Sequence, residues 1–288
     1  MFKRRIREPI TTRWKVLWGC IGIAVLVGCY SYLSYRQHQK NPLDTTLPNL
    51  EQFAEGVKLI VTPHENSLLA ALGENEKPRT FWTQVQATWL WQDGVATYTR
   101  LFKGLFVGCF FSIILGTLMG CYEWLASLLI PPLSYLAKVP GTAMLAVFFV
   151  MVGTGESMFL VMISFGVLPT LTQSIYLAAK DDLHVEEINK AYTLGASNLE
   201  LIWNIVFQKI LPKVIDNTRL QIGPAMVFLI AAEMLVGQVG IGFQIRMQQR
   251  LLHMNVVYIY LILLGVTGLM MDRAMISLRN RLCPWFGK

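Results

Sequence analysis

Residues 184–212 read HVEEINKAYTLGASNLELIWNIVFQKILP, and the interpretation of the whole chain depends on this stretch. Its apolar side chains recur near helical spacing, at Leu194, Leu201, Ile205 and Val206. Gly195 interrupts the pattern about midway, and Ser197 can cap the helix that follows. Leu211 and Pro212 are expected to end it, because proline cannot supply the next helical N–H group. The pattern predicts two short helices joined at a glycine, with an apolar stripe that needs a partner surface.

The stretch resembles the cytoplasmic coupling loop of ABC-importer permeases, whose signature runs Glu-Ala-Ala, three residues, Gly, and then a spacer that closes on Leu-Pro. Asn189 and Lys190 replace the Glu and the first Ala of that signature, and Gln208 stands where many members carry a proline. The resemblance assigns residues 180–218 to a coupling loop; an ordinary helix–glycine–helix connector is the alternative. The residues taken as candidates for coupling to an ATPase are Glu187, Ala191, Gly195, Ala196, Ser197, Leu201, Leu211 and Pro212.

Composition independently indicates a membrane protein. Of the 288 residues, 54% are hydrophobic and 15% charged, with a mean hydropathy of +0.46, whereas soluble domains carry about 25% charged residues. The net charge of +7 is spread through the loops, which fits the lysine and arginine bias of cytoplasmic loops better than a nucleic-acid-binding patch. The five cysteines have no CxxC spacing, so neither a disulfide set nor a metal site is predicted.

The first third of the chain predicts a membrane anchor and an external segment. Residues 14–35 form an apolar run long enough to cross a bilayer, behind a strongly basic flank that should stay in the cytoplasm. Residues 1–36 are therefore interpreted as a cytoplasmic tail and a retained anchor helix, with a cleaved signal peptide as the alternative. Residues 37–99 are more polar and are expected in the periplasm, with one amphipathic helix near residues 50–60.

Residues 100–280 are expected to form the permease core. Further apolar runs lie at 101–122, 125–152, 158–179, 220–239 and 256–271, which makes about six spans with both termini in the cytoplasm. The run 125–152 is broken by Pro131, Pro132, Pro140 and Gly141. It suits either a helix lining a pathway or a short interfacial segment followed by a span. Residues 240–255 are expected to form an outer turn.

Two features of the spans are candidates for helix packing or for the translocation pathway. Small residues recur every fourth position at Gly104, Gly108, Ser112, Gly116 and Gly120, a pattern that lets helix backbones approach closely in lipid. Glu233 lies inside an apolar run, where a carboxylate is a functional candidate by default and an interhelical hydrogen bond is the structural alternative. The candidate residues for helix packing or for the translocation pathway are Pro140, Gly108, Gly116 and Glu233.

The sequence contains no motif for catalysis. Nothing matches the phosphate loop G-x-x-x-x-G-K-[ST], and no Ser/His/Asp set or metal-spaced cluster is present. The chain is therefore expected to bind no cofactor and to be no enzyme. Its work would be conformational, with ATP hydrolysed by another subunit.

Outside the coupling loop, three stretches resemble the nitrate/sulfonate/taurine branch of these permeases: WQDGVATYTRLFKGLFVG (91–108), KVPGTAMLAVFFVMVGTGE (138–156) and RLQIGPAMVFLIAAEMLVG (219–237). The resemblance implies an all-helical permease of the type I importer kind in a bacterial inner membrane. It implies a homodimer, two ATP-binding subunits on the coupling loops and a periplasmic binding protein that delivers a small solute such as nitrate, a sulfonate, taurine or bicarbonate. A secondary transporter or channel without an ATPase is the main alternative, and a membrane-anchored scaffold that uses residues 37–99 is a third.

Overall fold

The computed structural model describes residues 11–41, 45–62, 85–86 and 88–286, and within them the chain is helical and contains no strand. The helices are α1 (Thr12–Lys40), α2 (Leu50–Val61), α5 (Trp89–Cys121), α6 (Glu123–Leu136), α7 (Leu145–Val152), α8 (Glu156–Asp182), α9 (Val185–Thr193), α10 (Asn198–Leu201), the π-helix η1 (Ile202–Phe207), α11 (Gln208–Val236), α12 (Ile241–Arg250) and α13 (Met254–Leu282). The all-α membrane fold predicted from the sequence is confirmed.

Five of the described helical segments are long and apolar enough to cross a bilayer: α1, α5, α8, the continuous segment from α10 to α11, and α13. The remaining predicted span, 125–152, consists of two separate helices. Helix α6 has 14 residues and α7 has eight, so they are about 21 Å and 12 Å long, and each is shorter than the roughly 30 Å hydrocarbon core. The part of the chain that the structure describes therefore has five helices long enough to span and one interrupted segment.

The interruption lies at two of the four predicted residues, Pro140 and Gly141, and not at Pro131 or Pro132. Helix α6 continues through both of them and ends at Leu136, and the irregular backbone covers residues 137–144. Gly141, in this break, and Gly166, in α8, both lie directly against the ring of Phe228 from α11, where neither has room for a Cβ atom. The break thus packs against α11 through the Phe228 ring, which also lies against α8, and burial against protein is the condition for irregular backbone at membrane depth.

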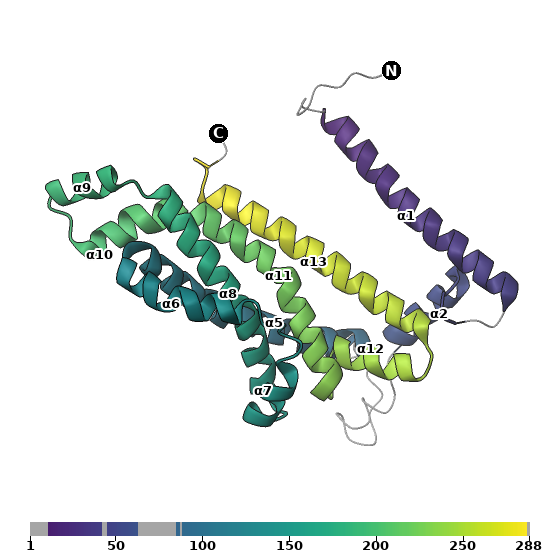
Figure 1. Ribbon diagram of the computed structural model, residues 1–288. Helices are drawn as coiled ribbons and strands as arrows, with labels where there is room; N and C mark the ends of the chain where they lie inside the picture. The colour runs from purple at the N-terminus through teal and green to yellow at the C-terminus, as the bar shows by residue number, and fades with distance from the viewer. Residues whose placement is uncertain (1–10, 42–44, 63–84, 87, 287–288) are drawn as a thin grey trace.

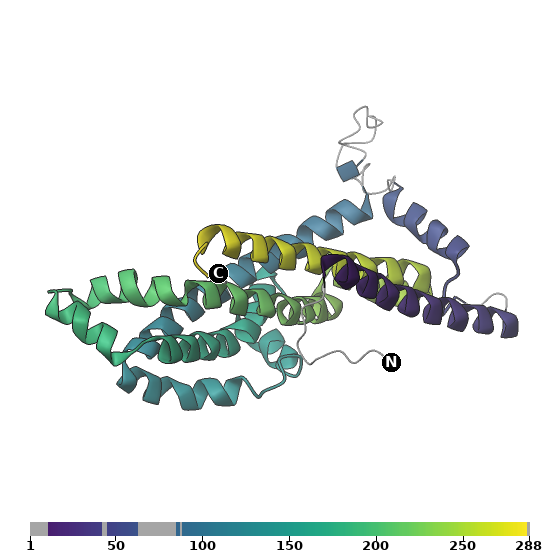
Figure 2. The ribbon, with the colours of Figure 1, turned by 90° about the horizontal axis from the view of Figure 1, so that it is seen from above.

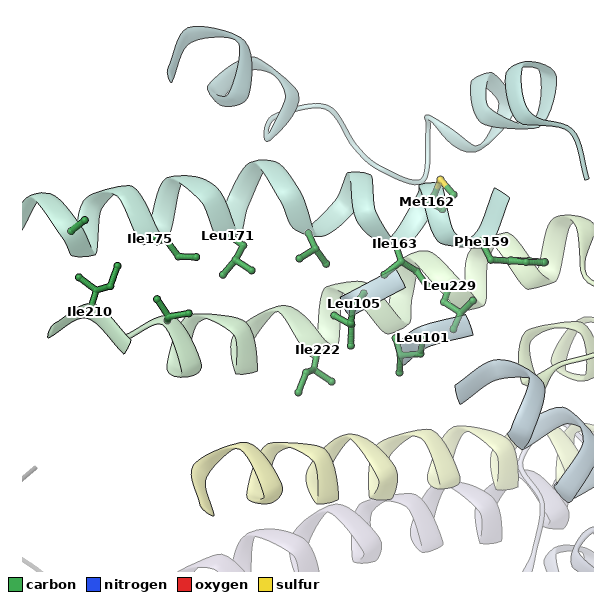
Figure 3. Packing of buried hydrophobic residues seen from close by; sticks show 14 of the residues in the cluster. Leu101, Leu105, Phe159, Met162, Ile163, Leu171, Ile175, Ile210, Ile222 and Leu229 are labelled. Atoms are coloured by element: carbon green, nitrogen blue, oxygen red, sulfur yellow. The ribbon is translucent and has the colours of Figure 1, made fainter. Parts of the chain in front are cut away.

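The core is formed by α5, α8 and α11. Leu171 and Ile175 of α8 point toward α11, from which Ile210 points back toward α8 (Figure 3). Ile222 of α11 and Leu101 and Leu105 of α5 belong to the same buried cluster. The small residues of α5 all lie against α8. A Cβ atom added at Gly104 or Gly116 would come within 3.0 Å of Ile163 or Ile175, and Ser112 Oγ donates to the carbonyl of Leu168 at 3.2 Å.

Helix α11 begins before the expected span. The sequence predicted a stop at Leu211-Pro212 and a new span from about residue 220, but helical structure runs without a gap from Asn198 to Val236, a segment of 39 residues. Pro212 is buried inside α11. It lies shortly after the π-helix Ile202–Phe207, and its missing N–H removes one hydrogen bond from α11 without ending the helix.

Two opposite ends of the bundle are visible in Figures 1 and 2. Helices α9 and α10 project at one end, called here the α9–α10 end, and α12 and α2 lie at the other, called the α12 end. Helix α1 begins and α13 ends on the same side of the molecule (Figure 1). Helix α1 stands away from the bundle and none of its apolar window is buried. It contacts the rest through Tyr30, whose ring lies near Phe53 of α2 and Tyr258 of α13.

Two helices begin where the sequence did not predict them. Helix α5 begins at Trp89, so the segment 37–99 contains the start of a spanning helix, which the polar residues of its first turns obscured. Residues 240–255 are not a simple turn, because Ile241–Arg250 form helix α12, which buries Ile241 and Ile245. The amphipathic helix expected near residues 50–60 is confirmed as α2, and residues 63–84 of the same segment lie outside the described part of the chain.

Candidate functional site

The turn between α9 and α10 is built by local backbone chemistry. Gly195 has a φ of +86°, a left-handed conformation that favours glycine. Ala196 N–H donates to the carbonyl of Ala191 at 3.0 Å, and Gly195 N–H donates to that of Tyr192 at 3.0 Å. These two bonds form a Schellman motif, which satisfies the free carbonyls at the end of α9. The bend is therefore fixed by hydrogen bonds and by the glycine.

Ser197 caps the next helix, as the sequence predicted. Its Oγ accepts from the backbone N–H of Glu200 at 3.4 Å, and the Glu200 carboxylate accepts from the backbone N–H of Ser197 at 2.9 Å. This reciprocal pair is a capping box, which fixes the start of α10.

One side of this turn is attached to the bundle. Ala191, Leu201 and Val206 are buried in the main core cluster. The Lys209 ammonium at the start of α11 forms an ion pair with Glu187 of α9. The hydrogen bond from Lys209 lowers the pKa of Glu187 below its usual value. Helix α9 is thus connected to α11 both by apolar contacts and by a charge pair.

The other side of the turn is exposed and apolar. We call these exposed side chains the α9–α10 face: Val185, Tyr192, Leu194, Leu199 and Trp203. Leu194 is 88% exposed and Leu199 78%. Burying one large aliphatic side chain stabilises an association by about 1.5–3 kcal/mol, so contiguous apolar residues at a projecting bend are typical of an interaction surface.

The α12 end contains a buried network centred on Glu233, near the end of α11. Its carboxylate is fully buried and accepts from three donor groups: the Thr97 hydroxyl at 2.9 and 3.0 Å, the Arg100 guanidinium at 2.9 Å and the Gly242 N–H at 2.9 Å. A buried carboxylate with this many donors is stabilised in the charged form by hydrogen bonds and by its counter-ion. Glu233 therefore joins α11 to α5 and to α12.

A second buried carboxylate, Asp93, extends the network to α13. Asp93 Oδ1 accepts from the Gly240 N–H at 2.9 Å, and Oδ2 accepts from the Tyr260 hydroxyl at 3.3 Å. Gly240 has a φ of +133°, and a Cβ atom there would lie 2.6 Å from Glu233 Cδ. The turn between α11 and α12 can approach the two carboxylates this closely only because residue 240 is glycine.

Arg100 connects the buried network to the surface. Its Nη1 donates to Glu233 and, at 2.7 Å, to the carbonyl of Val239, while its Nε and Nη2 donate to Glu156 in the first turn of α8. The Phe159 ring lies under the guanidinium, 4.2 Å from Cζ to the ring centroid, close enough for a cation–π contact. One side chain thus holds the start of α8, the end of α11 and the turn that follows it.

The predicted site residues fall into separate regions. The residues of the coupling loop lie at the α9–α10 end, although Leu211 and Pro212 belong to the interior of α11. Glu233 lies at the opposite end within the buried network. Gly108 and Gly116 pack against α8, and Pro140 is exposed in the break between α6 and α7. The described residues bring together no three His, Cys, Asp or Glu side chains that could hold a metal ion.

Sequence reasoning missed Asp93, Thr97 and Arg100. They follow one another at spacings of four and three residues, which places them on one face of α5. This spacing indicates a polar face on a helix. It was not recognised from the sequence because the residues lie in a segment interpreted as mostly external to the membrane.

Comparison with known proteins supports the same family. Residues 110–282 match the family model described as "binding-protein-dependent transport system inner membrane component". The chain is 27% identical over 199 residues to the taurine transport system permease protein TauC of Escherichia coli, covering 69% of this chain and 72% of that protein. It is 27% identical over 191 residues to the nitrate import permease protein NrtB of Synechocystis, covering 66% and 68%.

A third relative is the putative aliphatic sulfonates transport permease protein SsuC of Escherichia coli, 26% identical over 193 residues and covering 67% of this chain and 73% of that one. Among solved structures, a chain of the MetNI methionine ABC transporter in an inward-facing conformation has a TM-score of 0.55 at 16% identity. The alignment covers 67% of this chain and 97% of that chain. At this identity the likeness concerns the fold.

Proposed function

The chain belongs to the family of binding-protein-dependent transport system inner membrane components, and on that premise we propose that it is the membrane subunit of an ATP-driven importer of a small anion. Membership makes it a multi-pass transport permease of the nitrate/sulfonate/taurine type, and the family works with ATP-binding subunits and substrate-binding proteins. The proposal adds the substrate class, the surface that receives the ATP-binding subunit and the direction of transport.

The observation that carries the proposal is the α9–α10 face. Its side chains are exposed, while the backbone that presents them is fixed by the Schellman motif at Gly195 and the capping box at Ser197. A rigid bend with an apolar outer surface suits a docking element, because little conformational entropy is lost when a partner covers it. We assign this face to the ATP-binding subunit, with residues 186–206 seated in a cleft of that subunit.

The connection from this face to the rest of the bundle supports a mechanical role. Helices α10 and α11 belong to one helical segment of 39 residues, about 58 Å long. It starts in the α9–α10 face and carries Glu233 close to its other end. A displacement of α10 by ATP-driven closure of the partner would therefore move α11 and pull on the network at the α12 end, 35 residues away in sequence. Transport would follow as the bundle alternates between inward-facing and outward-facing states.

The charges favour placing the α9–α10 end in the cytoplasm. Lys190, Lys209 and Lys213 lie on α9 and the first turns of α11, and Arg273 and Arg281 lie in the last third of α13; cytoplasmic loops of membrane proteins carry an excess of Lys and Arg. Arg246 lies at the α12 end, where its guanidinium donates to the carbonyl of Leu235 at 2.9 Å and so caps the end of α11. A local structural role thus accounts for this arginine on the proposed outer side.

The substrate class rests on the relatives, whose names specify taurine, nitrate and aliphatic sulfonates. All are small solutes with an oxyanion group. We further propose that two copies of this chain pair, each binding one ATP-binding subunit, with ATP held by that subunit and the anion delivered from the α12 side by a periplasmic binding protein.

The proposal is tested by purifying the tagged chain from its native membrane and identifying what accompanies it. We expect a protein with a phosphate-loop motif, and ATP-dependent uptake of nitrate, taurine or methanesulfonate by proteoliposomes that contain the complex and the binding protein. Uptake by the chain alone, with no nucleotide and no copurifying ATPase, would instead identify a secondary transporter or channel.

A further inference from the structure

The two edges of the Arg100 guanidinium are paired differently. Nη1 points inward, to the fully buried Glu233 and the carbonyl of Val239. Nε and Nη2 form the outward edge and together hold the two carboxylate oxygens of Glu156, with Nε 2.8 Å from Oε2. The Arg100 side chain is 11% exposed and that of Glu156 is 70% exposed. The inward pairing therefore fixes the arginine, and the outward pairing is open to solvent.

The outward pair is the weaker of the two. An ion pair with an exposed partner contributes little to stability, because water solvates the carboxylate almost as well when it is released. Breaking the inward pair would leave a fully buried charge without a partner, which is strongly destabilising. Glu156 can thus leave Arg100 easily, whereas Arg100 cannot easily leave Glu233.

The outward edge has the geometry that recognises oxyanions. Two parallel N–H groups of a guanidinium bind two oxygens of one planar or tetrahedral oxyanion, and carboxylate, nitrate and sulfonate all present such a pair. The surroundings add positive potential. Lys103 lies exposed one turn along α5, and the first N–H groups of the 27-residue helix α8 have no side-chain cap. Phe159 holds the guanidinium plane from below.

We propose that Arg100 is an anion-binding residue at the α12 mouth of the permease and that Glu156 is its internal counter-ion, displaced when an oxyanion arrives. This inference rests on the proposed import of a small anion from that side. Displacement of Glu156 releases the first turn of α8 from α5 while Arg100 keeps its contacts with α11. Arrival of the anion is thereby linked to a change in how α5 and α8 are joined at this end.

The test measures the reactivity of a cysteine that replaces the counter-ion. In a chain whose five native cysteines are replaced by alanine or serine, Glu156→Cys is labelled with an anionic thiol reagent, sulfonatoethyl methanethiosulfonate, and with the cationic trimethylammonium analogue. Ser157→Cys, one residue along the same helical turn and also exposed, is the matched control, because Glu156 still neutralises the outward edge there. The full-length protein is used in lipid nanodiscs.

We expect the ratio of anionic to cationic labelling rates at residue 156 to exceed that at residue 157 roughly fivefold, which corresponds to a favourable interaction of about 1 kcal/mol near water. Nitrate or methanesulfonate should slow anionic labelling at residue 156 more than chloride at equal ionic strength, because chloride has no pair of oxygens for the guanidinium edge. Adding Arg100→Lys should keep part of the preference and Arg100→Gln should remove it. If the Arg100→Gln protein does not fold, the comparison of the labelling ratios at positions 156 and 157 still tests whether Arg100 attracts an anion.

Equal ratios at the two positions would overturn the proposal, since Arg100 would then have withdrawn onto Glu233. Failure of both nitrate and methanesulfonate to slow the labelling would overturn it as well. The labelling needs neither nucleotide nor a partner protein. A negative result therefore leaves the importer proposal standing, and a chain that proves not to be an importer still gives a readable labelling result.

Discussion

The Nη1 atom of Arg100 lies 2.9 Å from the Glu233 carboxylate, although the two residues are 133 positions apart in the sequence. This contact joins α5 to the end of α11, the helix whose other end continues into α10 and the α9–α10 face. The two ends of the molecule are therefore connected through one helical segment, with an exposed apolar surface at one end and a buried polar network at the other.

The first prediction concerns the unequal partners of Arg100. Arg100→Met leaves the fully buried Glu233 without its counter-ion, so we expect the free energy of unfolding to fall by about 3–5 kcal/mol. Glu156→Gln removes only the exposed partner and should cost at most about 1 kcal/mol. Unfolding of the purified chain in mixed detergent micelles measures both. Equal destabilisation by the two substitutions would show that the inward pair is not the principal one.

The second prediction concerns the glycines between α5 and α8. A Cβ atom at Gly116 would lie 2.8 Å from both Ile175 Cβ and the carbonyl oxygen of Thr172, whereas one at Gly108 would meet its nearest neighbours at 3.3 Å. Gly116→Ala should therefore destabilise the protein by roughly 1–3 kcal/mol through overpacking, and Gly108→Ala by less. The same unfolding assay measures both variants. A larger loss of unfolding free energy in Gly108→Ala than in Gly116→Ala would contradict this packing of α5 against α8.

The third prediction concerns the bend at Gly195. Its φ of +86° is strained for a residue with a Cβ atom, and most strained for a β-branched one. Gly195→Val should reorient α10 and lower substrate uptake per ATP hydrolysed by the reconstituted complex. Gly265→Val is the control, because that glycine of α13 is helical and its Cβ position is open. If Gly195→Val takes up as much substrate per ATP hydrolysed as the unsubstituted complex, the bend at Gly195 has no role in coupling.

The fourth prediction concerns pH. The hydrogen bond from Lys209 lowers the pKa of Glu187. A carboxyl group whose pKa is lowered on folding stabilises the fold above its ordinary pKa, and this contribution disappears as the pH falls through the lowered value. The pair should thus be intact between about pH 6 and pH 8. Hydrogen exchange of the α9 amides, corrected for intrinsic rates, should therefore show equal protection at about pH 6 and at about pH 8.

Glu187→Gln provides the comparison for this measurement. It should reduce the protection of α9 modestly and by the same factor at both pH values, since the amide carries no charge to titrate. Protection in the unsubstituted protein that disappears on going from the higher to the lower pH would show that another group controls the attachment of α9.

Much of this structure was predictable from the sequence, because the signals were local. The apolar runs identified the spans, the glycine and the capping serine identified the bend between α9 and α10, and the amphipathic pattern near residue 55 identified α2. Proline was the least reliable guide. Pro212, Pro131 and Pro132 all lie inside helices, since helix ends depend on whether neighbouring elements and local backbone adjustments accommodate the missing N–H group.

The buried network was not predicted because its contacts are long-range. Asp93 meets Gly240 across 147 positions and Thr97 meets Glu233 across 136, and no periodicity in one helix reveals the partner in another. Glu233 was recognised as unusual in an apolar run, but only the packing of α5, α11 and α12 shows that donors surround it on several sides.

The measurement that tests the central claim most directly is cross-linking from the α9–α10 face in native membranes. A photoreactive residue in place of Leu199 should cross-link the chain to an ATP-binding subunit, and the yield should change when ATP is bound. The same residue in place of Val150, an equally exposed apolar position on α7, should not cross-link to that subunit. Cross-linking from residue 150 and none from residue 199 would contradict the account.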